Sequence, residues 1–269
     1  MNQVTEKKSA GLPSNMFEGD AAKGLGAIGQ DDLALPFLKI LGQLSPEVNK
    51  RDGKYVEGAE PGMIFNSVSG ELYDGVKGID VIPCFYKLEY IEWKDRGEGL
   101  GAPVAIYDSS SDIMSKTTPD AIYDSSSDIM SKTTPDANYK DRLPNGNYIE
   151  KTASHFVIIT GDNPSTALIS MKSTQLKISR KWNTMMNGIR LKGAKGLFTP
   201  ASFSHIYKLK TTQMSNDKGT WFGWEVSKVG PITDQSLYSQ AKSFSESISK
   251  GAVKAKHGET ETKSKDSII

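Results

Sequence analysis

The chain has 269 residues and a formal net charge of +1, with 37% hydrophobic and 24% charged residues. This composition can supply a hydrophobic core, whereas the nearly balanced charge gives no general attraction to a polyanion. The single cysteine, Cys84, excludes an intramolecular disulfide, and no apolar run of about 18 residues and no signal peptide is present. We therefore expect a cytoplasmic protein without a membrane segment, in which residues 31–250 form one β-rich domain.

Residues 1–30 lack periodicity and are rich in Gly, Ala, Lys and Glu, which predicts a flexible arm. A G-x-G-x-x-G match at 24–29 follows no strand and so does not indicate a dinucleotide site. The next stretch predicts a short helix that ends at Pro46 and covers a sheet, with Asp31 or Asp32 as its N-cap. Its apolar face at helical spacing consists of Leu33, Phe37, Ile40, Leu41 and Leu44.

The middle of the chain is dense in β-branched and aromatic residues, which predicts a series of strands. The expected strands are 62–68, 78–93, a hairpin of 155–161 with 166–172, and a second hairpin of 204–213 with 220–229. Pro83 within 78–93 indicates an edge strand or a bulge. Apolar residues at helical spacing predict a helix at 173–186 and a C-terminal helix at 233–250. Residues 251–269 are expected to be disordered.

Residues 105–120, AIYDSSSDIMSKTTPD, recur without change at 121–136. Two identical units do not make a solenoid, because such repeats diverge and need at least three units. We interpret the repeat as a tandem duplication within a flexible insertion at 97–147, and expect no function from the second copy.

Positive charge and aromatic rings are concentrated between residues 171 and 228, which hold eleven basic and two acidic residues. Proteins that hold single strands need a cationic groove for the backbone and ring faces for the bases. The alternative is that the rings fill the core and the lysines form a solvated surface. The candidate nucleic-acid-binding residues are Lys177, Arg180, Lys181, Trp182, Arg190, Lys192, Lys195, Tyr207, Lys208, Lys210, Trp221 and Trp224.

Other chemistry has little support in the sequence. The three histidines and Cys84 do not have the spacing of a zinc site, and Cys84 lies within an apolar strand, as structural cysteines do. Four carboxylates, Glu89, Glu92, Asp95 and Glu98, could in principle serve a metal-dependent nuclease, but their spacing is typical of a solvated strand end. We expect no catalysis, no metal and no cofactor.

Five stretches, DDLALPFLKILGQLSPEV, EGAEPGMIFNSVSGELYDG, VIPCFYKLEYIEW, ALISMKSTQLKISRKWN and SNDKGTWFGWEV, resemble a group of tailed-bacteriophage proteins of replication and recombination modules. The resemblance covers most of residues 30–245 and is to the phage single-stranded DNA-binding proteins. It implies an OB-type barrel. The near-neutral C-terminal tail differs from the acidic tails common in such proteins, so it does not support partner recruitment through the C-terminus.

The expected fold is mainly β with a few helices (α+β), an OB-like β-barrel with a covering N-terminal helix and a C-terminal helix. The expected function is non-catalytic binding of single-stranded DNA during phage DNA replication or recombination, in the cytoplasm of the bacterial host. Phage replication or recombination proteins are candidate partners, and a homo-oligomer is compatible with the sequence. The alternative is a structural or accessory phage protein, for instance a virion or scaffold component.

Overall fold

The computed structural model describes residues 34–95, 97–98, 101–108, 126–217, 219–253 and 257. The chain divides into two units, Met1–Leu33 and Ala34–Ile269, and all described residues belong to the second. The predicted arm at 1–30, its glycine motif and most of the predicted disordered tail lie outside the described residues. No described helix is long and apolar enough to cross a membrane.

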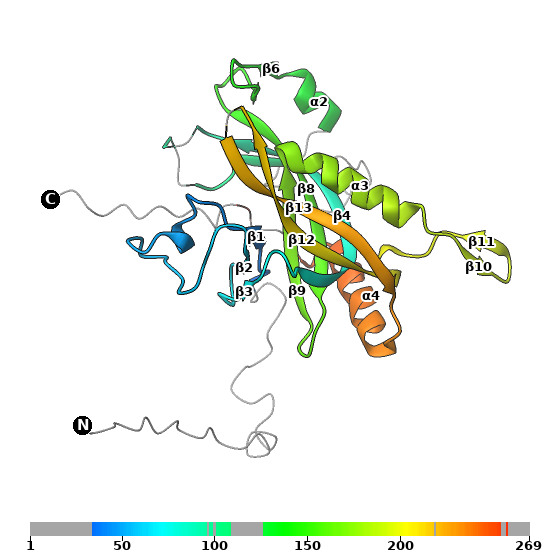
Figure 1. Ribbon diagram of the computed structural model, residues 1–269. Coiled ribbons are helices and arrows are strands. Elements are labelled where there is room, and N and C mark those ends of the chain that lie inside the picture. Colours follow the sequence, from blue (N-terminus) through cyan, green and yellow to red (C-terminus); the bar gives the residue numbers. More distant parts are fainter. Residues whose placement is uncertain are drawn as a thin grey trace, which may run out of the picture. The chain divides into compact units, whose positions relative to one another are not determined.

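A curled antiparallel sheet dominates the described residues (Figure 1). Its five long strands are β4 (Ile79–Trp93), β8 (Tyr148–Ile159), β9 (Ser165–Lys172), β12 (His205–Asn216) and β13 (Gly219–Pro231). They lie in the order β13-β12-β4-β8-β9, so β4 is central and pairs with both β12 and β8. The predicted strand at 78–93 and both predicted hairpins are confirmed.

Strand β4 bends where its ladder with β8 is interrupted. The register between these strands shifts between Pro83 and Phe85, which marks a β-bulge. Proline has no N–H to donate to a ladder, and a bulge accommodates it within a central strand. Of the two positions predicted for Pro83, the bulge is therefore the one observed.

Helices pack on both faces of the sheet. On one face, α3 (Leu176–Asn187), which follows the short helix η4 (Ser173–Gln175), inserts Trp182 among Val157, Tyr207 and Leu209. On the other face, α4 (Gln235–Ser249) packs Ala241, Phe244 and Ile248 against Ile82, Phe156 and Leu168. Both predicted helices are confirmed, and Asp234 caps α4 by accepting hydrogen bonds from the N–H groups of Ser236 and Leu237.

The helix predicted between Asp31 and Pro46 is wrong in its described part, which instead holds strand β1 (Leu38–Ile40). Strand β1 pairs with β2 (Ile64–Asn66), and Leu168 N–H donates to Pro36 O, so long-range backbone bonds replace helical ones. Leu41 is fully buried while Leu44 is 98% exposed, although helical spacing would place both on one face. Tertiary pairing has overridden the helical pattern.

Strand β2 also pairs with β3 (Leu72–Tyr73), after the short helix η2 (Pro46–Val48), and the small sheet β1-β2-β3 fills a gap in the main sheet. Strand β1 contacts both β9 and β13, the two outer long strands. The small sheet is also tied to β12, because Thr211 Oγ1 donates to Gly62 O and Thr211 N–H donates to Gly75 O. The small sheet thus bridges β9 and β13, the two long strands at the edges of the curled main sheet.

Several short elements lie in the segment predicted as a flexible insertion. They are β5 (Ala105–Asp108), α2 (Ser126–Ser131), β6 (Thr134–Pro135) and β7 (Asp141–Arg142). Strand β5 extends the sheet along β4, and β7 extends it along β8. Tyr107 from the first copy of the repeat and Ile129 from the second pack in one cluster with Leu143 and Ile149. Both copies therefore contribute to the fold.

Candidate functional site

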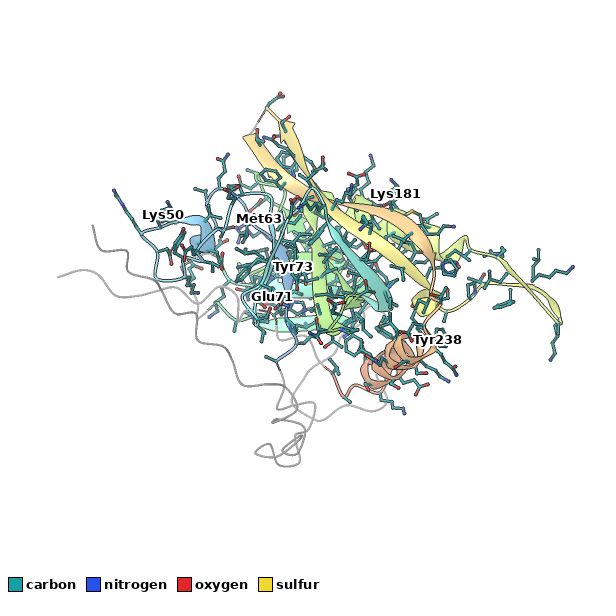
Figure 2. All side chains as sticks on the ribbon, turned by 60° about the horizontal axis from the view of Figure 1, so that its bottom comes forward. Lys50, Met63, Glu71, Tyr73, Lys181 and Tyr238 are labelled. Atoms are coloured by element: carbon teal, nitrogen blue, oxygen red, sulfur yellow. The ribbon has the colours of Figure 1, made fainter. Side chains whose placement is uncertain are left out.

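The outer face of α3 carries the basic residues predicted for this helix. Lys177, Arg180 and Lys181 are all exposed, whereas Ser179 and Trp182 are buried against the sheet. Figure 2 shows Lys181 on the outer side of α3, on the opposite side of the domain from Lys50. Residues 163–216 contain no Asp or Glu, so no acidic side chain of this segment neutralises the surface.

This charge arrangement costs helix stability. Lys177 and Lys181 are spaced i, i+4, and like charges at that spacing destabilise a helix by about 0.2–0.5 kcal/mol. Lys177 also lies in the first turn, which contains no acidic residue, although the positive end of the helix dipole favours acidic side chains there. A surface that keeps uncompensated positive charge at such a cost is a candidate for binding an anion.

A shallow, open pocket of about 370 Å³ lies at the start of this surface. It is lined by Thr174, Asn216, Gly219, Thr220 and Trp221, which come from η4 and from the tip of the β12–β13 hairpin. Gln175 holds η4 against the hairpin, because its side-chain oxygen accepts a hydrogen bond from Trp224 N–H at 2.8 Å. The half-buried Trp221 is therefore an aromatic ring beside the first turn of α3.

Two more predicted lysines lie on β12 in a mixed-charge environment. Lys208 Nζ lies 2.7 Å from Asp80 Oδ1, and Lys210 is opposite Glu225 in the ladder with β13. Strand alternation puts both lysines on the same face of β12 as Met214, the ladder partner of Trp221. Both lysines therefore have an acidic group close by.

Three of the predicted stacking residues are buried. Trp182 and Tyr207 are fully buried and Trp224 is 4% exposed. These rings belong to the core, so the prediction that they stack on bases is wrong. Each fills the space between the sheet and α3, where large rings remove the most apolar surface from water. Burial raises the pKa of Tyr207, which keeps its hydroxyl neutral. Trp221 is the predicted ring that retains an exposed surface.

The remaining predicted residues lie at or beyond the C-terminal end of α3. Arg190 precedes a hairpin made of β10 (Leu191–Gly193) and β11 (Gly196–Phe198), which carries Lys192 and Lys195. The strands of this hairpin have three residues each, too few for a sequence pattern to predict. Phe198, which is 47% exposed, is also not among the predicted residues.

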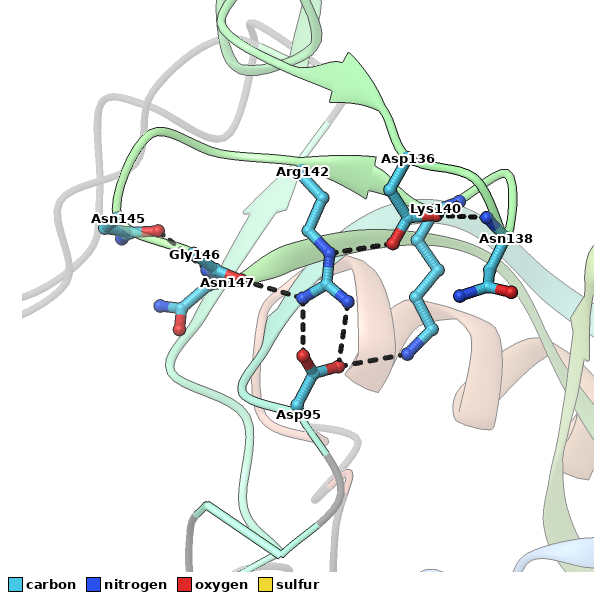
Figure 3. Close-up of polar contacts among 8 residues, drawn as sticks. All are labelled: Asp95, Asp136, Asn138, Lys140, Arg142, Asn145, Gly146 and Asn147. Atoms are coloured by element: carbon cyan, nitrogen blue, oxygen red, sulfur yellow. Dashed lines mark hydrogen bonds and ion pairs between the residues drawn. The ribbon is translucent and has the colours of Figure 1, made fainter.

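The carboxylates considered for a nuclease do not gather in one place. Strand alternation puts Glu89 and Glu92 on opposite faces of β4. Asp95 instead joins Arg142, Lys140 and Asp136 in a network of ion pairs that ties the end of β4 to the β6–β7 turn (Figure 3). Hydrogen bonds from Arg142 and Lys140 lower the pKa of Asp95. Among the described residues no group of His, Cys, Asp and Glu side chains has an arrangement that could hold a metal ion.

Glu89 is buried and forms a separate polar cluster. Its Oε2 accepts a hydrogen bond from Ser154 Oγ at 2.7 Å and lies 3.0 Å from His257 Nε2, and Lys87 pairs with its other oxygen. Burial opposes the charged form, but the bond to His257, the charge of Lys87 and the bond from Ser154 outweigh it and lower the pKa of Glu89 to about 2. His257, in the tail predicted to be disordered, therefore contacts the sheet.

Cys84 and His155, also considered for catalysis, are core residues. Burial raises the pKa of the Cys84 thiol to about 12, so little thiolate forms near neutral pH. His155 is fully buried under Trp182. Neither side chain is accessible to a substrate in this arrangement.

A family model for Pam3 phage gp34-like proteins matches residues 5–254. The chain belongs to this bacteriophage protein family. No curated protein and no solved structure matches it. The match covers the whole sheet, α3, α4 and the β10–β11 hairpin, so the candidate surface lies within the family's common region.

Proposed function

We propose that the chain is a non-catalytic single-stranded DNA-binding protein, built on an OB-type barrel, that acts in phage DNA replication or recombination. The observation that carries the proposal is the basic outer face of α3, within a segment (163–216) that holds no Asp or Glu, next to Trp221. A cationic track beside an exposed ring is the combination that binds single strands with little sequence preference.

The strand order supports the barrel. Along the chain, the five long strands are β4 (first), β8 (second), β9 (third), β12 (fourth) and β13 (fifth). In the sheet they lie side by side in the order fifth, fourth, first, second, third. Helix α3 lies between the third and fourth strands. An OB fold is a five-stranded, partly open Greek-key barrel with a helix in that connection. The small β1-β2-β3 sheet lies in the opening between the third and fifth strands.

The position of Trp221 fits the same proposal. In OB folds the loop between strands four and five contributes to oligonucleotide binding. Here that loop is the tip of the β12–β13 hairpin, which lines the pocket with Trp221 and Thr220. The outer face of β8, which would be the other usual contact surface, is covered by α4. We therefore place the strand along the hairpin tip and α3.

The test is tryptophan fluorescence of the purified protein titrated with oligo-dT at two salt concentrations. We expect quenching that weakens at higher salt and that is strongly reduced in Trp221→Phe, because Trp182 and Trp224 are buried. The fourth tryptophan, Trp93, is half-buried at the end of β4, so Trp93→Phe is the matched control and should retain the quenching. The K177A/K181A variant should bind more weakly, with a salt dependence flatter by about 0.7 per lost phosphate contact.

The matched control is K50A/R51A, which removes the same charge from exposed residues on another part of the domain. Equal losses in both variants would show that binding depends on net charge and not on α3. No quenching and no mobility shift with the wild-type protein would overturn the proposal and favour the structural or accessory role.

A further inference from the structure

The β10–β11 hairpin extends away from the sheet after the end of α3 (Figure 1). Its two strands pair with each other, in the register Leu191 with Phe198 and Gly193 with Gly196, and they form a sheet separate from the main one. An isolated two-stranded hairpin is only marginally stable in water. This hairpin therefore needs local stabilisation, and its position leaves both of its faces available to a partner.

The base of the hairpin is fastened by Arg190. The Nη1 group of Arg190 donates to Asn187 O, Ile189 O and Thr199 Oγ1, which joins the residues before β10 to those after β11. The Phe198 ring packs closely over Gly193, where an added Cβ would lie 3.2 Å from the ring. Arg190 thus serves the hairpin's own structure, and a flat, narrow ribbon projects beyond it.

The ribbon is both basic and apolar on its surface. Lys192 and Lys195 are exposed, and Leu197 and Phe198 are 74% and 47% exposed. Exposed apolar side chains gathered on one projecting element mark an interaction site. Because no acidic residue occurs between 163 and 216, the positive charge of Lys192 and Lys195 is not balanced within this segment and favours an anionic partner.

Duplex DNA fits these features. The major groove, about 12 Å wide, admits a two-stranded β-ribbon, whose strands are about 4.8 Å apart. Lys192, which shares a face of the ribbon with its ladder partner Leu197, and Lys195 at the tip can contact phosphates, and apolar side chains such as Phe and Leu can wedge against base steps. A single strand bound along α3 would lead directly to the ribbon, because α3 ends three residues before Arg190.

We propose that the β10–β11 ribbon contacts duplex DNA adjoining the bound single strand, so that the protein recognises junctions between single-stranded and double-stranded DNA. This inference rests on the proposed function, since α3 and Trp221 hold the single strand while the ribbon holds the duplex.

The experiment compares binding of three labelled DNAs: oligo-dT, a blunt duplex, and the same duplex with an oligo-dT overhang. Wild-type protein should bind the overhang substrate at least about tenfold more tightly than an oligo-dT of the same length as the overhang. This gain is what on the order of two added phosphate contacts would give. The K192A/K195A variant should lose that preference while its oligo-dT affinity changes less than about twofold, and K177A/K181A should weaken binding to oligo-dT. Phe198→Ser tests the wedge as a separate variant, because this substitution also removes the ring's contact with Gly193.

The outcomes separate the two proposals. Oligo-dT binding without a preference for the junction overturns the ribbon's role and leaves the proposed function intact. Equal losses on oligo-dT and on the junction in K192A/K195A place the ribbon in the single-strand site and overturn the duplex contact. Unchanged binding of every DNA by K192A/K195A overturns it too and points to an acidic protein as the ribbon's partner. No binding of oligo-dT by the wild type refutes the proposed function itself.

Discussion

Trp182 of α3 stacks on His155 of β8, with 4.5 Å between the ring centroids and 20° between the ring planes. The Nε2 atom of His155 also lies 2.8 Å from Ser179 Oγ, one turn earlier on the same helix. All three side chains are buried, so a stacked pair and a hydrogen bond fix α3 on the sheet. The candidate surface is the opposite face of that helix, and its position is set by this contact.

The buried imidazole predicts that acid destabilises the protein. Burial lowers the pKa of His155 to about 3, whereas an unfolded histidine has a pKa of about 6.5. Between these values the unfolded chain binds a proton that the folded chain does not. The free energy of unfolding should therefore fall as pH drops below about 6.5, by up to about 1.4 kcal/mol per pH unit.

Urea denaturation at pH 7.5, 6.0 and 5.0 measures this dependence. In His155→Gln the fall between pH 7.5 and 5.0 should be smaller, while the acidic groups such as Glu89, which titrate below that range, are unaffected. An identical pH profile in both proteins would show that His155 does not cause the acid sensitivity.

The strand observed in place of the predicted N-terminal helix gives a second prediction. Leu41→Ala should destabilise the protein by about 2–5 kcal/mol because it empties a fully buried site. Leu44→Ala should change stability by less than about 0.5 kcal/mol, since that side chain is 98% exposed. Thermal or urea denaturation of both variants measures the difference. Comparable losses would instead support the helical face that the sequence predicts.

Gly75 lies where the small sheet meets β12 and should not tolerate a side chain. An added Cβ would lie 2.0 Å from Gly62 O and 2.1 Å from Thr211 Oγ1, so the backbone would have to move. Gly75→Ala should cost about 1–3 kcal/mol or more through overpacking. Gly53→Ala is the control, because nothing lies within 4 Å of its Cβ position. Equal stability of the two variants by urea denaturation would contradict the close contact.

The repeated segment predicts that one copy is sufficient for folding. Deleting residues 109–124 joins Asp108 to Ser125 and retains β5, α2 and the buried Ile129. Loop closure depends weakly on length, so the free energy of unfolding should change by less than about 1 kcal/mol. By comparison, Ile129→Ala in the full chain should cost about 2 kcal/mol or more. If the deletion is as costly as that substitution, the removed residues themselves stabilise the fold.

The candidate site could be predicted only in part, because composition does not reveal orientation. The excess of basic residues and the helix at 173–186 were visible in the sequence, and the structure places Lys177, Arg180 and Lys181 on the exposed face of α3. The helical spacing of the apolar residues and the positions of the basic residues together identify the exposed face of α3, because a helix buries its apolar stripe. The aromatic rings carried no such signal, because apolar rings on a strand can face either a core or a ligand.

Periodicity and turn chemistry over a few residues account for the local structure: the long strands, the two hairpins and helices α3 and α4. For Pro83 they left an edge strand and a bulge as alternatives, and the pairing of β4 with β8 selected the bulge. Tertiary structure decided the rest. It made a strand of Leu38–Ile40 through pairing with β2, buried Trp182, Tyr207 and Trp224, and left Trp221 half-buried and Phe198 exposed. These outcomes depend on contacts between residues far apart in the chain, whose energies exceed the local preferences that a sequence pattern expresses.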